Sequence, residues 1–231
     1  MSKESEKLRD WALPALAGLV LTGWLWLAPG PDQSQATPRR SQRRRRCDCK
    51  RYIGLFEQYA APLGIPVAYL QALACRESSC DPGDRKGPAW GLMQITEVVR
   101  RNEAREDGKD GRYSRSELLD PAVSVFLCTR ILGKTIKILN GLDIETDWQD
   151  PRWVGLVTAG WNAGYSLRGG LGLTVKYLLR QGWRPDEIDI VAVHEHAERA
   201  GATRFLWKFP RRLRWWRSVV DLYFRILNSQ E

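Results

Sequence analysis

Residues 66–83 read PVAYLQALACRESSCDPG, and this stretch carries the pattern that decides the fold class. A proline suits the first turn of a helix, and after Pro66 the apolar residues Leu70 and Leu73 recur at the spacing of one helical face. Glu77 continues the same face, and the turn residues that follow it end the helix. The stretch therefore predicts a helix from Pro66 to about Glu77, with a carboxylate on its core-facing side.

The position of Glu77 suggests general acid catalysis. Where a core meets a cleft, partial loss of water raises the pKa of a carboxyl group and keeps it protonated near neutral pH. A single glutamate on an apolar face can equally be the ion-pair partner of an arginine such as Arg130. Periodicity alone leaves both interpretations open.

Helix boundaries recur along the rest of the chain, whereas strand patterns are almost absent. An Asp-Pro pair at 120–121 predicts a helix that ends at 140–141, and a second Asp-Pro pair at 150–151 predicts one that ends at 162–164. A further helix is predicted over 174–181. We therefore expect a mainly α fold without internal repeats.

The first 51 residues have the composition of a tail, a membrane anchor and a linker. Residues 11–28 carry no charge, contain tryptophans near both ends and are about long enough to span a bilayer. We assign 1–10 as a tail, 11–30 as a transmembrane helix and 31–51 as a basic, disordered linker. A cleaved signal peptide is the alternative, but no clear cleavage site follows the apolar run.

Basic charge favours an anionic neighbourhood for this chain, whose formal net charge is +9. Nucleic acid, acidic lipid and acidic wall polymers all satisfy this condition. The four arginines at 43–46 either bind such a partner or form a solvated tether. Because they follow the apolar run, the positive-inside tendency would leave the main domain in the cytoplasm.

The spacing of the five cysteines argues against a metal site. None forms a C-x-x-C pair, and Cys47 and Cys49 stand one residue apart, so we expect neither a metal ion nor another cofactor. We expect a disulfide between Cys128 and either Cys75 or Cys80, because the helices that carry these residues should be neighbours.

Four short motifs occur in one order along the chain. They are Glu-Ser-Ser at 77–79, Gly-Leu-Met-Gln-Ile at 91–95, Leu-Asp-Pro at 119–121 and Trp-Asn-Ala-Gly at 161–164. Together they closely resemble the lytic transglycosylase domain of the soluble-lytic-transglycosylase (SLT) family. Each motif alone is weak, but their order and spacing make chance agreement improbable. The resemblance covers about residues 52–181 and includes a Thr-x-x-Tyr element at Thr174 and Tyr177.

The resemblance implies a lysozyme-like helical fold over 52–181, with Glu77 as the catalytic acid. A basic helical extension follows over 182–231. The residues that the resemblance assigns to the saccharide cleft or its support are Ser78, Met93, Gln94, Trp161, Asn162 and Tyr177. The hydroxyl of Tyr177 would lie beside the glutamate. Trp161 departs from the pattern, because the family usually has tyrosine at this position.

The activity that the resemblance implies is that of a peptidoglycan lytic transglycosylase. Such an enzyme cleaves the MurNAc–GlcNAc β-1,4 linkage and forms 1,6-anhydro-MurNAc ends. The alternatives are a hydrolase similar to goose-type lysozymes, and a non-catalytic scaffold protein that binds membrane or nucleic acid. We expect peptidoglycan glycan strands and the membrane as partners, with nucleic acid less favoured. Because the substrate is peptidoglycan, we expect the anchored domain on the periplasmic side of an inner or virion membrane, although the positive-inside tendency of the arginines favours the cytoplasm.

The C-terminal region contains a basic segment at 211–217 with two tryptophans, followed by apolar residues at helical spacing. Pro210 suits the start of this amphipathic helix. Its apolar stripe either lies on an anionic membrane or docks on the main domain. We favour docking slightly, with the arginines facing outward.

Overall fold

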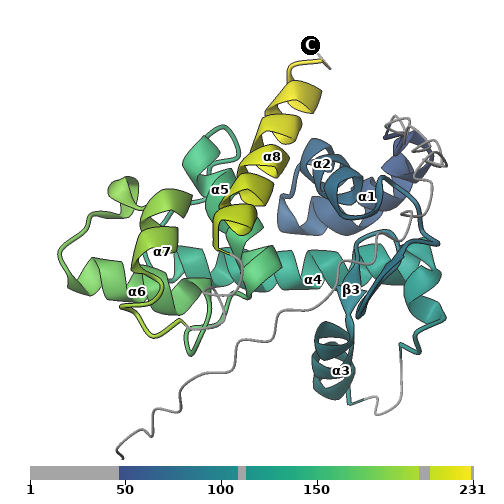
Figure 1. Ribbon diagram of the computed structural model, residues 1–231. Coiled ribbons are helices and arrows are strands. Elements are labelled where there is room, and N and C mark those ends of the chain that lie inside the picture. Colours follow the sequence, from purple (N-terminus) through teal and green to yellow (C-terminus); the bar gives the residue numbers. More distant parts are fainter. Residues whose placement is uncertain (1–46, 109–112, 203–208, 230–231) are drawn as a thin grey trace, which may run out of the picture. The chain divides into compact units, whose positions relative to one another are not determined.

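The structure is a computed structural model that describes residues 47–108, 113–202 and 209–229 (Figure 1). The predicted tail at 1–10, the predicted anchor at 11–30 and most of the predicted linker lie outside these residues. Among the described helices, none combines the length and the apolar composition that a bilayer crossing requires.

The described chain is mainly helical, as predicted. The helices in chain order are α1 (Ile53–Ala60), α2 (Val67–Ser78), α3 (Glu97–Glu106), α4 (Pro121–Asn140), α5 (Pro151–Ala163), α6 (Leu171–Arg180), α7 (Ile190–His196) and α8 (Phe209–Leu227). Single 3-10 turns are η1 (Lys50–Tyr52), η2 (Ala61–Leu63), η3 (Glu117–Leu119) and η4 (Pro185–Glu187). Figure 1 shows the long helix α4 passing below α1, α2 and α5.

The predicted helix boundaries are confirmed where proline and aspartate mark them. Pro66 has an extended backbone and precedes the first residue of α2, and Ser79 ends this helix in a left-handed conformation with φ 58°. The side chains of Asp120 and Asp150 each accept a hydrogen bond of 2.8 Å from the backbone N–H two residues on. These bonds satisfy donors that have no partner within the first turn of α4 and α5.

A small antiparallel sheet, which the sequence did not predict, connects α2 to α3. Its strands are β1 (Arg85–Lys86), β2 (Ala89–Trp90) and β3 (Ile95–Thr96), in the order β1-β2-β3. Arg85 pairs with Trp90, and Ala89 pairs with Thr96. Strands of two residues have no alternating pattern that a sequence could display.

Helix α2 lies in the middle of the hydrophobic core. Its residues from Ala68 to Ala74 are buried, and the hydroxyl of Tyr69 forms a hydrogen bond of 3.1 Å with that of Thr158 on α5. This bond joins α2 to α5, and the Tyr69 ring also packs against Tyr223 of α8. The helix that carries Glu77 is therefore fixed along most of its length.

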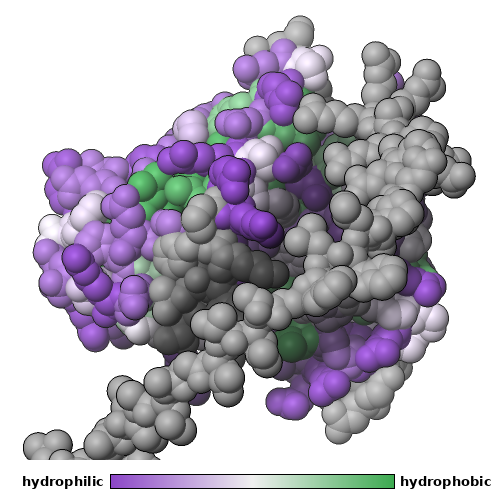
Figure 2. Space-filling view, in the orientation of Figure 1, coloured by the Kyte–Doolittle hydropathy of each residue, from purple (hydrophilic) through white to green (hydrophobic). Residues whose placement is uncertain are grey.

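The C-terminal helix α8 packs against α2 and α5 (Figure 1). Trp216, Val219 and Tyr223 on its inner side are at most 1% exposed. Arginines at 211, 214 and 217 lie on the exposed side, and the face in Figure 2 is mostly hydrophilic around small apolar areas. The docking alternative therefore agrees with the structure, and the apolar stripe is not free to enter a membrane.

The cysteine pairing differs from the prediction. Cys47 is bonded to Cys75 and Cys49 to Cys80, with Cα separations of 5.6 and 5.4 Å. Cys128 is free and buried on α4, so the predicted disulfide to this residue is wrong. The error arose because residues 47–51 were assigned to the disordered linker, whereas they fold against the end of α2 and bring two further cysteines there.

Candidate active site

The end of α2 borders a cavity of about 650 Å³. The sheet, α3, α4 and the end of α5 form its other walls. The residues that line it are Glu77, Lys86, Ala89, Gln94, Thr96, Val98, Val99, Asn102, Glu103, Ile131, Gly160, Trp161, Asn162, Ala163, Gly164, Tyr165 and Ser166. Three of the sequence motifs, Glu-Ser-Ser, Gly-Leu-Met-Gln-Ile and Trp-Asn-Ala-Gly, thus contribute to one cavity.

Glu77 lies in the last turn of α2 with its carboxylate partly buried. Its Oε1 accepts a hydrogen bond of 2.7 Å from the indole Nε1 of Trp161. The Lys86 ammonium donates to the backbone carbonyl of Glu77. Burial raises the pKa of Glu77 from 4.5 to about 7, while the Trp161 hydrogen bond and the charges of Lys86 and Arg76 act in the opposite direction. Near neutral pH this group can both donate and accept a proton.

Glu103 is the one other acidic residue among the described residues that line the cavity. It lies on α3, is fully buried, and is held by two cations of α4: Arg130 at 2.9 Å and Lys134 at 2.6 Å. The sequence pattern did not predict this residue and suggested Arg130 as a partner of Glu77 instead. Its partners follow it by 27 and 31 positions on another helix, so no local pattern reveals the pairing.

Gln94 turns its amide into the cavity wall from a left-handed backbone position with φ 51°. Its Nε2 donates to the carbonyls of Gly91 at 2.8 Å and Asp84 at 3.1 Å. Its Oε1 is buried and has no hydrogen-bond partner among the described residues. Gly91 is required here, because a Cβ at this position would lie 1.9 Å from the carbonyl oxygen of Leu118. The turn thus fixes the Gln94 amide at the cavity wall.

A family model described as the transglycosylase SLT domain matches residues 54–169, half of the chain. This chain belongs to the SLT family. Membrane-bound lytic murein transglycosylase C of Shigella sonnei (strain Ss046) is 31% identical over 99 residues, which are 42% of this chain and 28% of that relative. The chain therefore spans little more than a quarter of the length of that relative.

Two solved structures share the fold of this SLT domain. One is the 70-kDa soluble lytic transglycosylase in complex with bulgecin A, with a TM-score of 0.51 and 23% identity. The other is an inactive mutant of the lytic transglycosylase Slt from Pseudomonas aeruginosa, with a TM-score of 0.50 and 19% identity. Each match covers 76% of this chain and 24% of the other chain.

Two predicted cleft residues of the SLT domain lie behind the cavity wall. The hydroxyl of Ser78 is buried and donates to the backbone carbonyl of Leu92 at 2.7 Å. Met93 is fully buried, and its backbone N–H donates to Ser124 Oγ on α4 at 3.0 Å. Neither is among the residues that line the cavity. Both form hydrogen bonds that hold the Gly-Leu-Met-Gln-Ile turn in place.

Asn162 lines the cavity and is also in contact with α8. The indole Nε1 of Trp216 donates to Asn162 Oδ1 at 3.3 Å. Trp216 lies outside the matched SLT region, so a helix of the C-terminal extension helps to orient a residue of the family motif. The sequence analysis placed this extension apart from the site.

Tyr177 is not among the residues that line the cavity. It lies on α6, and its ring centroid is 6.4 Å from that of His196 on α7. Tyr165 lines the cavity instead. Burial raises the pKa of Tyr165, with Lys134 acting in the opposite direction. Its position directly after the Trp-Asn-Ala-Gly motif was a signal that could have identified it.

Proposed function

We propose that this protein is a peptidoglycan lytic transglycosylase. It cleaves the MurNAc–GlcNAc β-1,4 linkage and leaves 1,6-anhydro-MurNAc ends. The observation that carries the proposal is the pair of carboxylates in the cavity: Glu77 has a pKa of about 7, whereas Glu103 is bound by two cations. The cavity therefore offers one carboxyl group for proton transfer.

Glu77 performs both proton transfers of this reaction. As the acid it protonates the glycosidic oxygen, and as the resulting carboxylate it accepts the proton of the MurNAc 6-hydroxyl, which attacks the anomeric carbon. A pKa of about 7 suits both steps, because an acid and a base of matched strength work best near the ambient pH. The nucleophile belongs to the substrate, so its proximity replaces an activated water molecule.

A hydrolase would ordinarily need a second carboxylate about 5 to 9 Å from the first, to attack the sugar or to activate water. Asp81, Asp84 and Glu97 are the acidic residues that follow Glu77 most closely in the sequence, and none of them lines the cavity. Asp81 accepts from a backbone N–H in its own turn. Asp84 pairs with Lys86 at 2.8 Å, and Glu97 pairs with two arginines of α3. Each already has a structural partner.

The saccharide is bound by polar groups that surround Glu77. Gln94 offers its buried Oε1 to a hydroxyl or N-acetyl N–H of the sugar. Asn162 and Trp161 contact the sugar from the end of α5, where Trp161 also orients the Glu77 carboxyl. Ser78 and Met93 act indirectly by holding the turn that carries Gln94.

A membrane anchor over 11–30 and a periplasmic catalytic domain complete the proposal. Support comes from the uncharged run of 18 residues at 11–28 and from the Shigella relative, whose name describes it as membrane-bound. The arginines at 43–46 favour the opposite topology. Fusions of a periplasm-dependent and a cytoplasm-dependent reporter after residue 231 decide between them. Activity of the cytoplasmic reporter alone would contradict the periplasmic placement.

Mass spectrometry of released muropeptides tests the reaction. The full chain, solubilised in detergent and incubated with purified sacculi, should release fragments with anhydro ends. Glu77→Gln should reduce the rate by about 10²- to 10⁴-fold, because the amide cannot donate a proton. The matched control is Glu57→Gln on the exposed side of α1, which should retain full activity. Reducing ends would identify a hydrolase, and no release by the folded wild type would favour a scaffold protein.

A further inference from the structure

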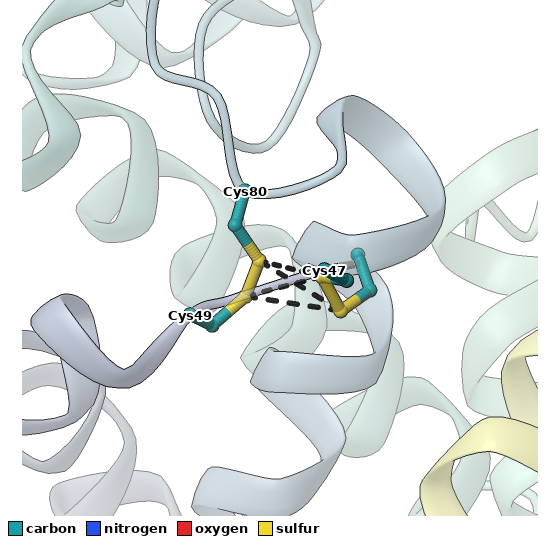
Figure 3. Close-up of side chains that lie close together, drawn as sticks. Cys47, Cys49 and Cys80 are labelled. Atoms are coloured by element: carbon teal, nitrogen blue, oxygen red, sulfur yellow. Dashed lines mark hydrogen bonds between the residues drawn. A yellow bond between two sulfur atoms is a disulfide. The ribbon is translucent and has the colours of Figure 1, made fainter. Parts of the chain in front are cut away.

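Four cysteine sulfurs converge beside the end of α2. Cys47 and Cys49 precede η1, Cys75 lies in the last turns of α2, and Cys80 follows that helix. All four sulfurs lie within 4.8 Å of one another, and Figure 3 shows the bonded pair Cys49–Cys80 with the Cys47 sulfur beside it. Two disulfides require contact only within each bonded pair of sulfurs. They do not require the two pairs to lie as close to each other as they do here.

Three of the four separations between sulfurs of different pairs are close to those of a metal tetrahedron. A Zn–S bond of about 2.3 Å gives a tetrahedral edge of about 3.8 Å. The separations are 3.8 Å for Cys47 and Cys49, 3.7 Å for Cys75 and Cys80, and 3.9 Å for Cys49 and Cys75. The separation of 3.0 Å between Cys47 and Cys80 must lengthen, as must the two bonded pairs. Side-chain rotations about a common centre accomplish this.

We propose that the thiol form of this cluster is a structural zinc site with four cysteine ligands. The chain is synthesised with thiols, and one Zn²⁺ replaces their four protons to give a tetrathiolate complex with no change of oxidation state. Disulfides and zinc exclude each other, because bonded sulfurs cannot act as thiolates. Soft thiolate ligands in a tetrahedral arrangement favour zinc among the divalent ions.

The surroundings of the cluster suit a bound metal. A zinc tetrathiolate carries two negative charges, and the guanidinium of Arg51 lies beside it, donating to the backbone carbonyl of Cys80 at 3.2 Å. Cys49 and Cys80 are buried, whereas Cys47 is exposed and leaves a route for the ion. The four residues between Cys75 and Cys80 match the spacing of structural zinc sites. The closer spacing of Cys47 and Cys49 explains why the sequence argued against a metal.

Zinc would hold the backbone on both sides of Glu77, which lies between Cys75 and Cys80. Ser79 and Cys80 both adopt left-handed conformations, with φ of 58° and 60°, and this bend returns the Cys80 sulfur to the cluster. Two successive left-handed residues other than glycine need such an external restraint. The zinc form would supply it in a reducing compartment, as where the chain is synthesised, whereas the disulfides supply it in the periplasm. The inference is independent of the proposed catalysis.

The test uses the full chain, purified without chelator under anaerobic, reducing conditions. Elemental analysis should find one zinc per chain. Substitution with Co²⁺ should give the thiolate-to-metal charge-transfer bands and strong visible bands of a tetrahedral sulfur site. Cysteine alkylation followed by mass mapping should show that zinc protects Cys47, Cys49, Cys75 and Cys80. The matched control is Cys128→Ser, which should retain the metal because Cys128 is outside the cluster.

Loss of zinc from the folded double variant C49S/C80S would support the proposal. If that variant does not fold, the cobalt spectrum and the alkylation pattern of the wild type still decide. The inference is overturned if folded, reduced protein contains less than about a tenth of an equivalent of zinc and its four thiols react equally with and without zinc. Metal retained by the double variant, or iron with sulfide in place of zinc, would overturn it as well.

Discussion

The indole N–H of Trp161 donates to the carboxylate of Glu77 at 2.7 Å, which links the end of α5 to the end of α2. Because a hydrogen bond to the charged form favours ionisation, the tryptophan keeps the pKa of Glu77 lower than burial alone would set it. The residue at 161 therefore influences the ionisation of Glu77.

Replacing Trp161 by phenylalanine should raise the pKa of Glu77 above its present value of about 7. A hydrogen bond to a charged group contributes about 1.5 kcal/mol or more, so the shift should be about one unit. The alkaline limb of the profile of kcat/KM against pH, where the acid loses its proton, should then move to higher pH. Trp161→Tyr, which restores a donor, is the control and should keep the limb near its original place. If the alkaline limb of the folded Trp161→Phe variant stays at the pH of the wild type, the hydrogen bond from the indole does not affect the ionisation of Glu77.

Glu77 should also make the free energy of unfolding depend on pH. Its pKa is about 7 in the folded chain and 4.5 in the reference state, so the folded chain binds more protons between these values. Stability should therefore decrease as the pH rises from 4.5 to 7, by about 3 kcal/mol in total for these pKa values. Glu77→Gln removes this dependence. Denaturant titrations should find the variant more stable than the wild type at pH 8, with a smaller difference at pH 5.

The comparison with Glu57→Gln controls for the loss of a negative charge in general, because Glu57 is exposed on α1. That variant should follow the wild type at both pH values. If Glu77→Gln is instead less stable than the wild type at pH 8, the interactions lost with the carboxylate outweigh the free-energy cost of burying its charge. An equal difference between variant and wild type at pH 5 and at pH 8 would show that burial does not raise the pKa of Glu77.

Much of the helical framework could be predicted, because proline and aspartate mark helix starts through local chemistry. Pro66, Asp120 and Asp150 act on the backbone within two residues of themselves. A helical period likewise predicted that Glu77 faces the core, whereas its proposed role as the acid came from the resemblance to the SLT family. Such signals depend on neighbours in the sequence.

Contacts between distant segments could not be predicted in this way. The cations that hold Glu103 follow it by 27 and 31 residues, and the segment that carries Cys47 and Cys49 had the composition of a linker. The charged residues of this segment predicted that it is solvated. Disulfides to Cys75 on α2 and to Cys80 after α2 instead attach it to the fold. The predicted role of Cys128 failed because the competing partners lay in that segment.

The bond from Trp216 to Asn162 predicts that α8 influences catalysis. Trp216→Phe keeps most of the buried ring but removes the donor, which should lower kcat/KM by about 3- to 10-fold, the value of one neutral hydrogen bond. The control on the same helix is Tyr223→Phe, which loses a bond of 3.0 Å to the carbonyl of Trp148 outside the cavity. Equal effects of both variants on kcat/KM, at equal loss of stability, would show that α8 acts through folding alone.

Glu103 provides the last prediction, because it is the residue on which a hydrolytic mechanism would depend. Its carboxylate is fully buried between Arg130 and Lys134. Removing one partner from a buried ionic network costs about 3–5 kcal/mol, so Glu103→Gln should lower the free energy of unfolding by an amount of that order. Glu106→Gln is the control: Glu106 contacts the same two cations at the surface, where its side chain is 50% exposed, and should change stability by about 1 kcal/mol or less. Below its reduced unfolding temperature the Glu103→Gln variant should still release muropeptides with anhydro ends. A folded variant that binds sacculi but releases nothing would instead make Glu103 a second catalytic carboxylate, and reducing ends in the wild-type product would then identify a hydrolysis.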